Sequence, residues 1–264
     1  MPTSARSIRR RDVIGTAVSI TDYAEVLDAI DQAIAADEKI FICCTPASSL
    51  IFARRDPRLR AALAEAAIVT PDGMGVVYAA RLLGEQITDR VYGPDLMLAQ
   101  CERAANAGQR IWLYGGFDDR SLAQLRSNLT TRFVGLEIVG SLSPPHREPT
   151  DAETDALVQR INADSPDVVW VGLGSPKQEL SMHTLRDRLD ASVLCGVGAA
   201  FDFHASRVSQ APGWMQRRGL EWLFRILRDP LRLGRRYLAT LPHFAVLVAG
   251  QALRERARRN DPLV

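Results

Sequence analysis

The chain has 264 residues, of which 47% are hydrophobic and 24% are charged, the composition of an ordinary soluble globular protein. The net charge of +2 is unevenly distributed, because residues 215–264 carry +7 and the preceding 214 residues carry −5. An acidic body with no visible recognition module excludes nucleic acid as the expected partner.

The cysteines and the N-terminal segment both indicate the cytoplasm. None of the four cysteines belongs to a C-x-x-C pair, so we expect buried, reduced thiols. Residues 1–15 contain basic side chains but no long apolar run behind them, which does not fit a signal peptide. No segment reaches the roughly 20 uninterrupted apolar residues of a spanning helix. The nearest one, residues 237–253, is interrupted by Pro242 and His243.

Short β-rich runs alternate with longer helical patterns as far as residue 201. Asp56 followed by Pro57 is typical of a helix start, and Gly108 of a helix end. The expected strands span residues 12–20, 39–45, 67–70, 110–116, 135–141, 167–174 and 192–201. The expected helices span residues 22–37, 56–66, 94–108, 119–133, 151–164 and 176–189, and another helical pattern begins at Met74.

Continuously apolar strands separated by helices predict an α/β fold, in which helices cover both faces of a parallel sheet. We assign this body to residues 1–209. Beyond it the alternation stops, and residues 210–264 predict only helices, interrupted at Gly219 and Pro230. This basic segment is expected to form a separate helical appendage.

In parallel sheets of this kind, ligands bind beyond the carboxyl ends of the strands. Polar residues or glycines follow several of the expected strands, so they should meet at one rim. They are Thr45, Asp72, Gly115, Gly116, the loop Gly172–Lys177 and the turn Gly196–Gly198.

The loop "GLGSPKQE" allows two interpretations. Gly172 and Gly174 permit a ligand to approach the backbone, and Lys177 adds positive charge where helix N–H groups attract anions, which favours a nucleotide phosphate. Alternatively, Ser175 and Gln178 form a capping box that needs no ligand. The two interpretations are compatible with each other.

The sequence gives little support for a bound cofactor or a metal site. Lys177 and Phe201 occupy the place of the third glycine of a dinucleotide-binding motif, so an NAD(P)-dependent oxidoreductase is a weak alternative. The sequence has no D-x-D pair and its histidines are scattered. We therefore expect neither a metal site nor a cofactor.

Two charged residues before the helix over 94–108 are candidates for chemistry. Asp72 is either a turn residue that accepts backbone N–H groups, or a partly desolvated carboxylate that can accept a proton. Arg90 is either a solvated surface residue or an anion binder. Asp95 fits helix capping better than reaction.

The appendage carries an apolar stripe among arginines. Leu220, Leu223, Ile226 and Leu227 share one helical face. Such a stripe usually packs on the body, but the density of arginine also favours anionic lipid headgroups or a diphosphate.

These motifs together resemble the WecG/TagA/CpsF family of glycosyltransferases, glycosyltransferase family 26. The resemblance covers roughly residues 12–236 and rests on "TPDGMGVVYAARLLG", "DRVYGPDL", "IWLYGG", "VVWVGLGSPKQE", "GVGAAFDFHASRVSQAP" and "GLEWLFRILRDPLR". It implies a Rossmann-like body that moves a sugar from a UDP-sugar to a saccharide on a polyprenyl diphosphate, for cell-surface polysaccharides. The enzyme would be a hexosyltransferase or an N-acetylmannosaminyltransferase on the cytoplasmic membrane face, and a homo-oligomer is compatible with it.

The resemblance also implies roles for individual residues, in an inverting reaction that needs no metal. Asp72 falls on the general base and Arg90 on an arginine near the reaction centre. Donor contacts are expected from Thr45, Gly115, Gly116, Gly172, Gly174, Ser175, Lys177, Gln178, Glu179 and Gly198. The acceptor diphosphate or the membrane would meet Arg225, Arg232, Arg235 and Arg236.

One position departs from the family pattern. The family has T-x-N after the second strand, whereas this chain has Thr45-Pro46-Ala47. Either Ser48 or Ser49 stands in for the missing amide, or the substrate differs. A catalytically degenerate, membrane-associated protein that only binds nucleotide-sugars is therefore the alternative.

Overall fold

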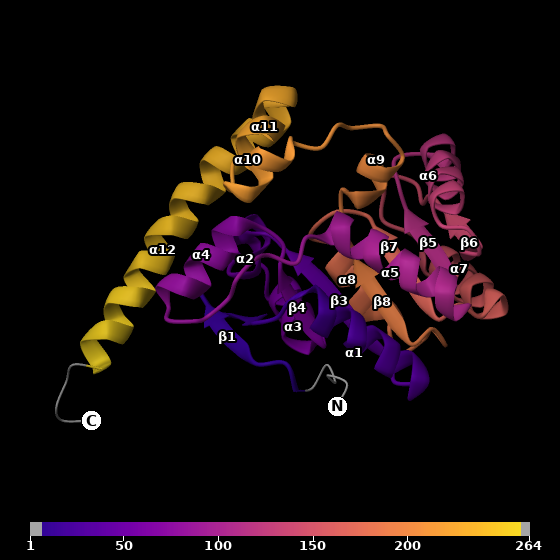
Figure 1. The fold of residues 1–264 in the computed structure, drawn as a ribbon, viewed down its shortest axis with the longest axis horizontal. Coiled ribbons are helices and arrows are strands. Elements are labelled where there is room, and N and C mark those ends of the chain that lie inside the picture. Colours follow the sequence, from indigo (N-terminus) through magenta and orange to yellow (C-terminus); the bar gives the residue numbers. More distant parts are fainter. Residues whose placement is uncertain (1–6, 260–264) are drawn as a thin grey trace.

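The computed structural model describes residues 7–259, and only the backbone of residues 232, 233, 235, 236 and 259. Its centre is a six-stranded, wholly parallel sheet in the order β4-β3-β8-β7-β5-β6 (Figure 1). The strands are β3 (Ile40–Thr45), β4 (Ile68–Pro71), β5 (Arg110–Gly115), β6 (Glu137–Leu142), β7 (Val168–Gly172) and β8 (Val193–Gly196).

Helices cover both faces of this sheet, because side chains alternate between the faces along each strand. In β3, Ile42 and Cys44 point to one apolar cluster, and Phe41 and Cys43 to the other. The first cluster is closed by α1 (Tyr23–Ala35), α5 (Gly93–Ala107), α6 (Asp119–Arg132) and α9 (Ala200–His204). The second is closed by α3 (Pro57–Glu65), α7 (Asp151–Asp164) and α8 (Lys177–Leu185). The predicted α/β architecture is confirmed.

Local signals set several helix ends as predicted. The Asp56 carboxylate accepts hydrogen bonds from the N–H groups of Arg58 and Leu59, and Pro57 is the first residue of α3. Gly108 ends α5 with a left-handed φ of 67°, a conformation that glycine adopts without a Cβ penalty.

All four cysteines are buried and free, as predicted: Cys43, Cys44, Cys101 and Cys195. Burial raises the pKa of the Cys101 thiol to about 12, and raises that of Cys195 well above its usual value. These thiols pack as small apolar side chains.

The first expected strand is wrong in one respect. Residues 10–19 form a hairpin of β1 (Arg10–Val13) and β2 (Thr16–Ser19), which is separate from the main sheet. Ile14 and Gly15 have φ angles of 49° and 91°, and two successive positive φ angles produce the tight turn that reverses an antiparallel pair. A continuous β-rich sequence did not reveal this turn.

The C-terminal part is helical, with the predicted breaks at Gly219 and Pro230. It contains α10 (Gly213–Arg217), α11 (Glu221–Arg228), the π-helical turn η2 (Pro230–Gly234) and α12 (Arg235–Arg259). Pro242 lies inside α12 and does not end it. Among the described residues, no helix combines the length and the apolar character needed to cross a membrane.

Helix α12 lies along α4 (Met74–Leu82) and α2 (Ala47–Ala53) (Figure 1). Phe244, Val248 and Ala252 on its inner face join an apolar cluster with residues of the hairpin, α2 and α4. The middle and later turns of α12 are therefore packed on the body.

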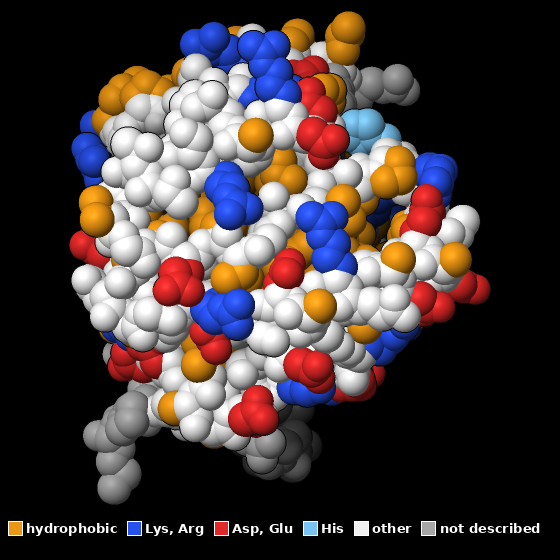
Figure 2. Space-filling model, turned by 90° about the vertical axis from the view of Figure 1, so that its right-hand side faces the viewer, with side chains coloured by type: hydrophobic (Ala, Val, Ile, Leu, Met, Phe, Trp, Pro, Cys, Tyr) orange, Lys and Arg blue, Asp and Glu red, His pale blue; other side chains and the backbone are white. Residues whose placement is uncertain are grey.

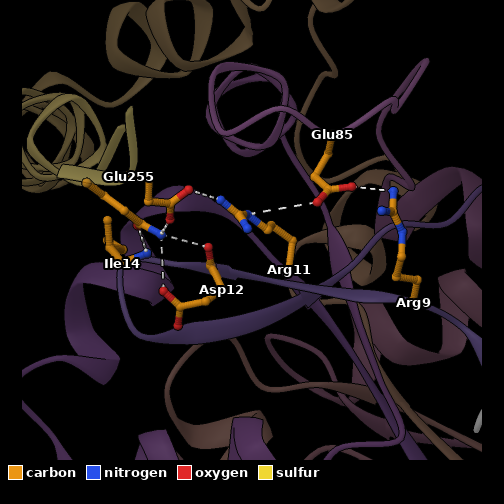
Figure 3. A network of polar contacts seen from close by, with 7 residues as sticks. Arg9, Arg11, Asp12, Ile14, Glu85 and Glu255 are labelled. Atoms are coloured by element: carbon orange, nitrogen blue, oxygen red, sulfur yellow. Dashed lines mark hydrogen bonds and ion pairs between the residues drawn. The ribbon is translucent and has the colours of Figure 1, made fainter. Parts of the chain in front are cut away.

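A polar network fixes the far end of α12 to the hairpin (Figure 3). The Gln251 side chain accepts a hydrogen bond from the Ile14 N–H at 2.8 Å and donates one to the Asp12 carbonyl at 3.0 Å. Arg11 pairs with Glu255 of α12 and also approaches Glu85. Because these contacts join residues some 240 positions apart in the chain, they set the position of α12 on the body.

Candidate active site

A cleft of about 830 Å³ opens beyond the carboxyl ends of the strands, where ligands bind in sheets of this type. Nine of the residues proposed from the sequence line it. They are Asp72, Gly116, Gly172, Gly174, Ser175, Lys177, Gln178, Gly198 and Arg225. The other proposed residues of the body, Thr45, Arg90, Gly115 and Glu179, are buried and do not line the cleft.

Asp72 follows the end of β4 and is held on both sides. Its N–H donates to the Thr45 carbonyl at 3.3 Å, and its carboxylate accepts the N–H of Gly93, the first residue of α5, at 2.7 Å. Burial raises the pKa of this carboxyl to about 7, although the Gly93 N–H opposes the shift. Asp72 is therefore partly ionised at neutral pH and basic enough to accept a proton.

Arg90 is buried behind Asp72, where it is paired rather than solvated. Its Nη1 donates to Glu221 Oε2 at 2.8 Å, and its Nη2 donates to Gln216 Oε1 at 2.8 Å. The guanidinium carbon lies 3.9 Å from the centre of the Tyr92 ring. The C-terminal helices thus reach the predicted reaction centre through side chains of α10 and α11.

Glu221 and Gln216 were not predicted as site residues. Glu221 is one of four acidic residues in the basic segment 215–264. An acidic residue at the start of the arginine-rich "GLEWLFRILR" was the one signal available. What it pairs with depends on how the chain folds back.

The glycines of the rim serve close packing as well as access. A Cβ on Gly172 would lie 2.5 Å from the Phe201 ring, and a Cβ on Gly115 would lie 2.5 Å from the Gly172 carbonyl oxygen. Neither position has room for a side chain. Gly174, by contrast, has a positive φ and open space around it, so its backbone is accessible from the cleft.

The predicted capping box at α8 is wrong. The Ser175 hydroxyl forms a hydrogen bond of 2.9 Å with the Ser49 hydroxyl, and α8 has no side-chain cap. Gln178 instead accepts the Gly198 N–H at 2.9 Å and donates to Glu179 at 3.3 Å. The Gln178 side chain points inward from α8, and its amide therefore connects α8 to the loop after β8.

Thr45 and Glu179, two further residues proposed as donor contacts, are buried within the protein. The Thr45 hydroxyl donates to the Cys43 carbonyl at 3.1 Å, and Glu179 is fully buried. Ala47, at the position where the family pattern has Asn, is buried in the cluster that α12 closes. Ser49, two residues further along α2, contacts the loop before α8 through the Ser175 hydroxyl.

Of the four proposed tail arginines, Arg225 lines the cleft, with its guanidinium carbon 5.8 Å from the Phe203 ring centre. The side chains of Arg232, Arg235 and Arg236 lie outside the described part of the structure. Only Arg225 can therefore be placed at the site.

The loop between β6 and α7, residues 143–150, also lines the cleft. His146 and Arg147 of this loop line it together with Phe117, whose ring is stacked 4.1 Å from the Arg207 guanidinium carbon. On the face of the molecule nearest β6 and α6, acidic and basic side chains are interspersed (Figure 2). Neither charge dominates that face.

Comparison with known proteins agrees with this geometry. The family model described as "Glycosyl transferase WecG/TagA/CpsF family" matches residues 11–258. The chain is 31% identical over 196 residues to the N-acetylglucosaminyldiphosphoundecaprenol N-acetyl-beta-D-mannosaminyltransferase of Bacillus spizizenii (strain ATCC 23059 / NRRL B-14472 / W23). That match covers 74% of this chain and 73% of the relative. The protein therefore belongs to the WecG/TagA/CpsF family and is a glycosyltransferase.

Proposed function

We propose that the protein transfers a sugar from a UDP-sugar to a saccharide carried on a polyprenyl diphosphate, with inversion at the anomeric carbon and without a metal ion. The observation that carries the proposal is Asp72, a carboxylate on the wall of a cleft of about 830 Å³, whose pKa is raised to about 7. General bases work best when their pKa lies near the working pH.

The proposed reaction is a single displacement. The acceptor hydroxyl oxygen forms a bond to the anomeric carbon while the bond from that carbon to the diphosphate oxygen breaks. The hydroxyl proton passes to the Asp72 carboxylate, and UDP leaves from the opposite side. General-base assistance of this kind accelerates a reaction by about 10²–10⁴-fold.

The leaving diphosphate needs positive potential, and the donor loop offers it. Lys177 is exposed at the first turn of α8 and lines the cleft, where the free N–H groups of a helix start attract anions. Gly174, with a positive φ and open space around it, leaves its backbone open to close approach, and Gly116 lines the same cleft. We assign the UDP moiety to this rim.

The acceptor assignment draws on the named reaction of the Bacillus spizizenii relative. Its name specifies an N-acetylglucosaminyl-diphospho-undecaprenol acceptor and an N-acetylmannosaminyl donor group. We propose the same classes here, a polyprenyl-diphosphate-linked N-acetylglucosamine and an N-acetylhexosamine. Arg225 is the described cation that would face the acceptor diphosphate.

We also propose that residues 210–264 attach the enzyme peripherally to the inner face of the cell membrane. Large apolar side chains are exposed on this segment beside its arginines, notably Trp214, Leu227 and Leu231, of which Leu231 is 83% exposed. Exposed apolar side chains combined with arginines bind the interface of anionic membranes.

The test is a transfer assay with a panel of UDP-hexoses and UDP-N-acetylhexosamines and a polyprenyl-diphosphate-linked N-acetylglucosamine. We expect UDP release stoichiometric with extended lipid product, and we expect Asp72→Asn to bind UDP but not to transfer. An Asn variant with near-normal turnover would refute the base assignment. UDP-sugar binding without a product would favour the binding-only alternative, and binding of NAD(P) in place of UDP would favour the oxidoreductase.

A further inference from the structure

We propose that Glu221 is a positioning residue, which couples the seating of α11 to the state of the Asp72 carboxylate through Arg90 and Tyr92. The inference rests on the proposed role of Asp72 as the general base. It adds a residue that the chemistry itself does not touch.

The two carboxylate oxygens of Glu221 bind two different partners. Oε1 accepts the Tyr92 hydroxyl at 2.7 Å, and Oε2 accepts Arg90 Nη1 at 2.8 Å. The side chains of Arg90 and Glu221 are only 9% and 12% exposed. A buried charge that has lost its partner is strongly unfavourable, so these two side chains hold each other in place.

The contact with Tyr92 leads directly to Asp72. Tyr92 lines the cleft and immediately precedes Gly93, whose N–H is the donor to the Asp72 carboxylate at 2.7 Å. The Tyr92 backbone N–H is itself fixed by the Tyr23 hydroxyl at 3.0 Å. Glu221 therefore orients a residue one peptide bond away from the hydrogen bond that Asp72 accepts.

The contact with Arg90 extends to α10. Arg90 Nη2 donates to Gln216 Oε1 at 2.8 Å, and Gln216 Nε2 donates to the Ala211 carbonyl at 2.8 Å. The Arg90 side chain is thus shared between the two short helices that follow the body. Both helices must be seated for Arg90 to hold its position.

A separate observation shows that the turn before α11 packs closely against the body. Gly219, between α10 and α11, has a φ of +69°, and a Cβ there would lie 3.0 Å from the Met74 Cβ. Met74 begins α4, two residues after Asp72. The turn that precedes Glu221 therefore packs against the start of α4, two residues after Asp72.

The charges around Asp72 predict in which direction its pKa changes in each variant. Glu221 raises the pKa of Asp72, and Arg90 and Arg225 lower it. Removing the Glu221 charge leaves Arg90 uncompensated, so the Asp72 pKa should fall; removing the Arg90 charge should raise it. The other titratable groups that face Asp72 are Tyr23 of α1, Tyr92 before α5 and Cys195 of β8. Asp95 of α5 faces Arg90 and Glu221.

The experiment measures kcat/KM for the acceptor across pH 5.5 to 9 in the full-length protein. In Glu221→Gln we expect the acidic midpoint to move below that of the wild type by about half a pH unit or more, and kcat at pH 8 to fall about tenfold. In Arg90→Gln the midpoint should move the opposite way, and in the double variant it should return toward the wild type. Asp229→Asn, which removes an equal charge at the other end of α11, is the matched control and should leave the midpoint in place.

A uniform loss of activity at every pH in Glu221→Gln, with an unchanged midpoint, would overturn the proposal and make Glu221 a purely structural residue. If Glu221→Gln does not fold, the acidic midpoints of Arg90→Gln and of the double variant are compared instead. A difference between these two midpoints supports the proposal, because only coupling through charge produces it, and equal midpoints overturn it. Failure of the proposed function gives a different result. In that case the pH profile of kcat/KM for Asp72→Asn would still fall on the acidic side as it does for the wild type.

Discussion

Replacing Asp72 by Asn should stabilise the protein at the same time as it removes transfer. The carboxyl of Asp72 has a pKa of about 7 in the folded protein, against an ordinary value of 3.8, mainly because of burial. The Asn side chain has nearly the same shape, and its oxygen can still accept the Gly93 N–H. The substitution therefore removes the buried charge and keeps the contact.

The sign of the effect follows from the direction of the shift. A carboxyl whose pKa is raised on folding binds its proton more tightly in the folded state, so stability falls as pH rises from about 4 to about 7. A shift from 3.8 to about 7 costs the ionised form up to about 4 kcal/mol, at about 1.4 kcal/mol per pH unit. Above this window the full cost is present, and below it there is none.

The measurement is urea or thermal unfolding of wild type and Asp72→Asn at several pH values between 4 and 8.5. We expect equal stability near pH 4 and an advantage for the variant of up to about 4 kcal/mol at pH 8.5, which raises the melting temperature by roughly 10 °C. Asp118→Asn is the control of opposite sign. Hydrogen bonds from Ser121 lower the pKa of the Asp118 carboxyl, so its loss should destabilise the protein above the unfolded pKa.

A difference between wild type and Asp72→Asn that stays constant across this range would refute the reasoning, because only titration of Asp72 makes it depend on pH. A variant that is less stable at pH 8.5 would refute it as well. In that case the ionised carboxylate would be stabilised by its surroundings.

Three further substitutions test other parts of the site. Gln178→Leu leaves the N–H that its amide oxygen accepts without a partner; we expect a loss of about 1–3 kcal/mol in urea unfolding and a higher KM for the UDP-sugar in initial-rate assays. Gly172→Ala places a Cβ 2.5 Å from the Phe201 ring, so it should lower the free energy of unfolding by about 1–3 kcal/mol in the same assay. An unfolding midpoint equal to that of the wild type would show that the ring can move aside. Leu227→Asp, at a side chain 71% exposed, should reduce co-sedimentation with anionic vesicles. Val134→Asp, at a side chain 91% exposed on the body, should leave it unchanged, and equal binding of both variants would contradict membrane attachment through α11.

The sequence alone was sufficient for the parallel sheet and most of the helices that cover it. Apolar strands of four to six residues and capped helices carry a strong local pattern, and Asp56 with Pro57 sets the start of α3 where it was expected. The rim was also predictable, because parallel strands present their carboxyl ends on the same side. Asp72, Gly174 and Lys177 were assigned to the cleft for that reason.

Other parts needed the tertiary structure. The hairpin turn at Ile14 depends on two backbone angles that a β-rich pattern does not reveal. The side chains of Ser175 and Gln178 turn to Ser49 and Gly198, which lie far away in sequence.

What the sequence by itself determined is therefore the body and the position of its cleft, since both follow from periodicity and from strand direction. What only the tertiary structure decided is how the C-terminal helices contact that cleft. The pairing of Glu221 with Arg90 joins residues 131 positions apart. No local preference specifies such a pair, because it exists only once the start of α11 lies against Arg90 and Tyr92.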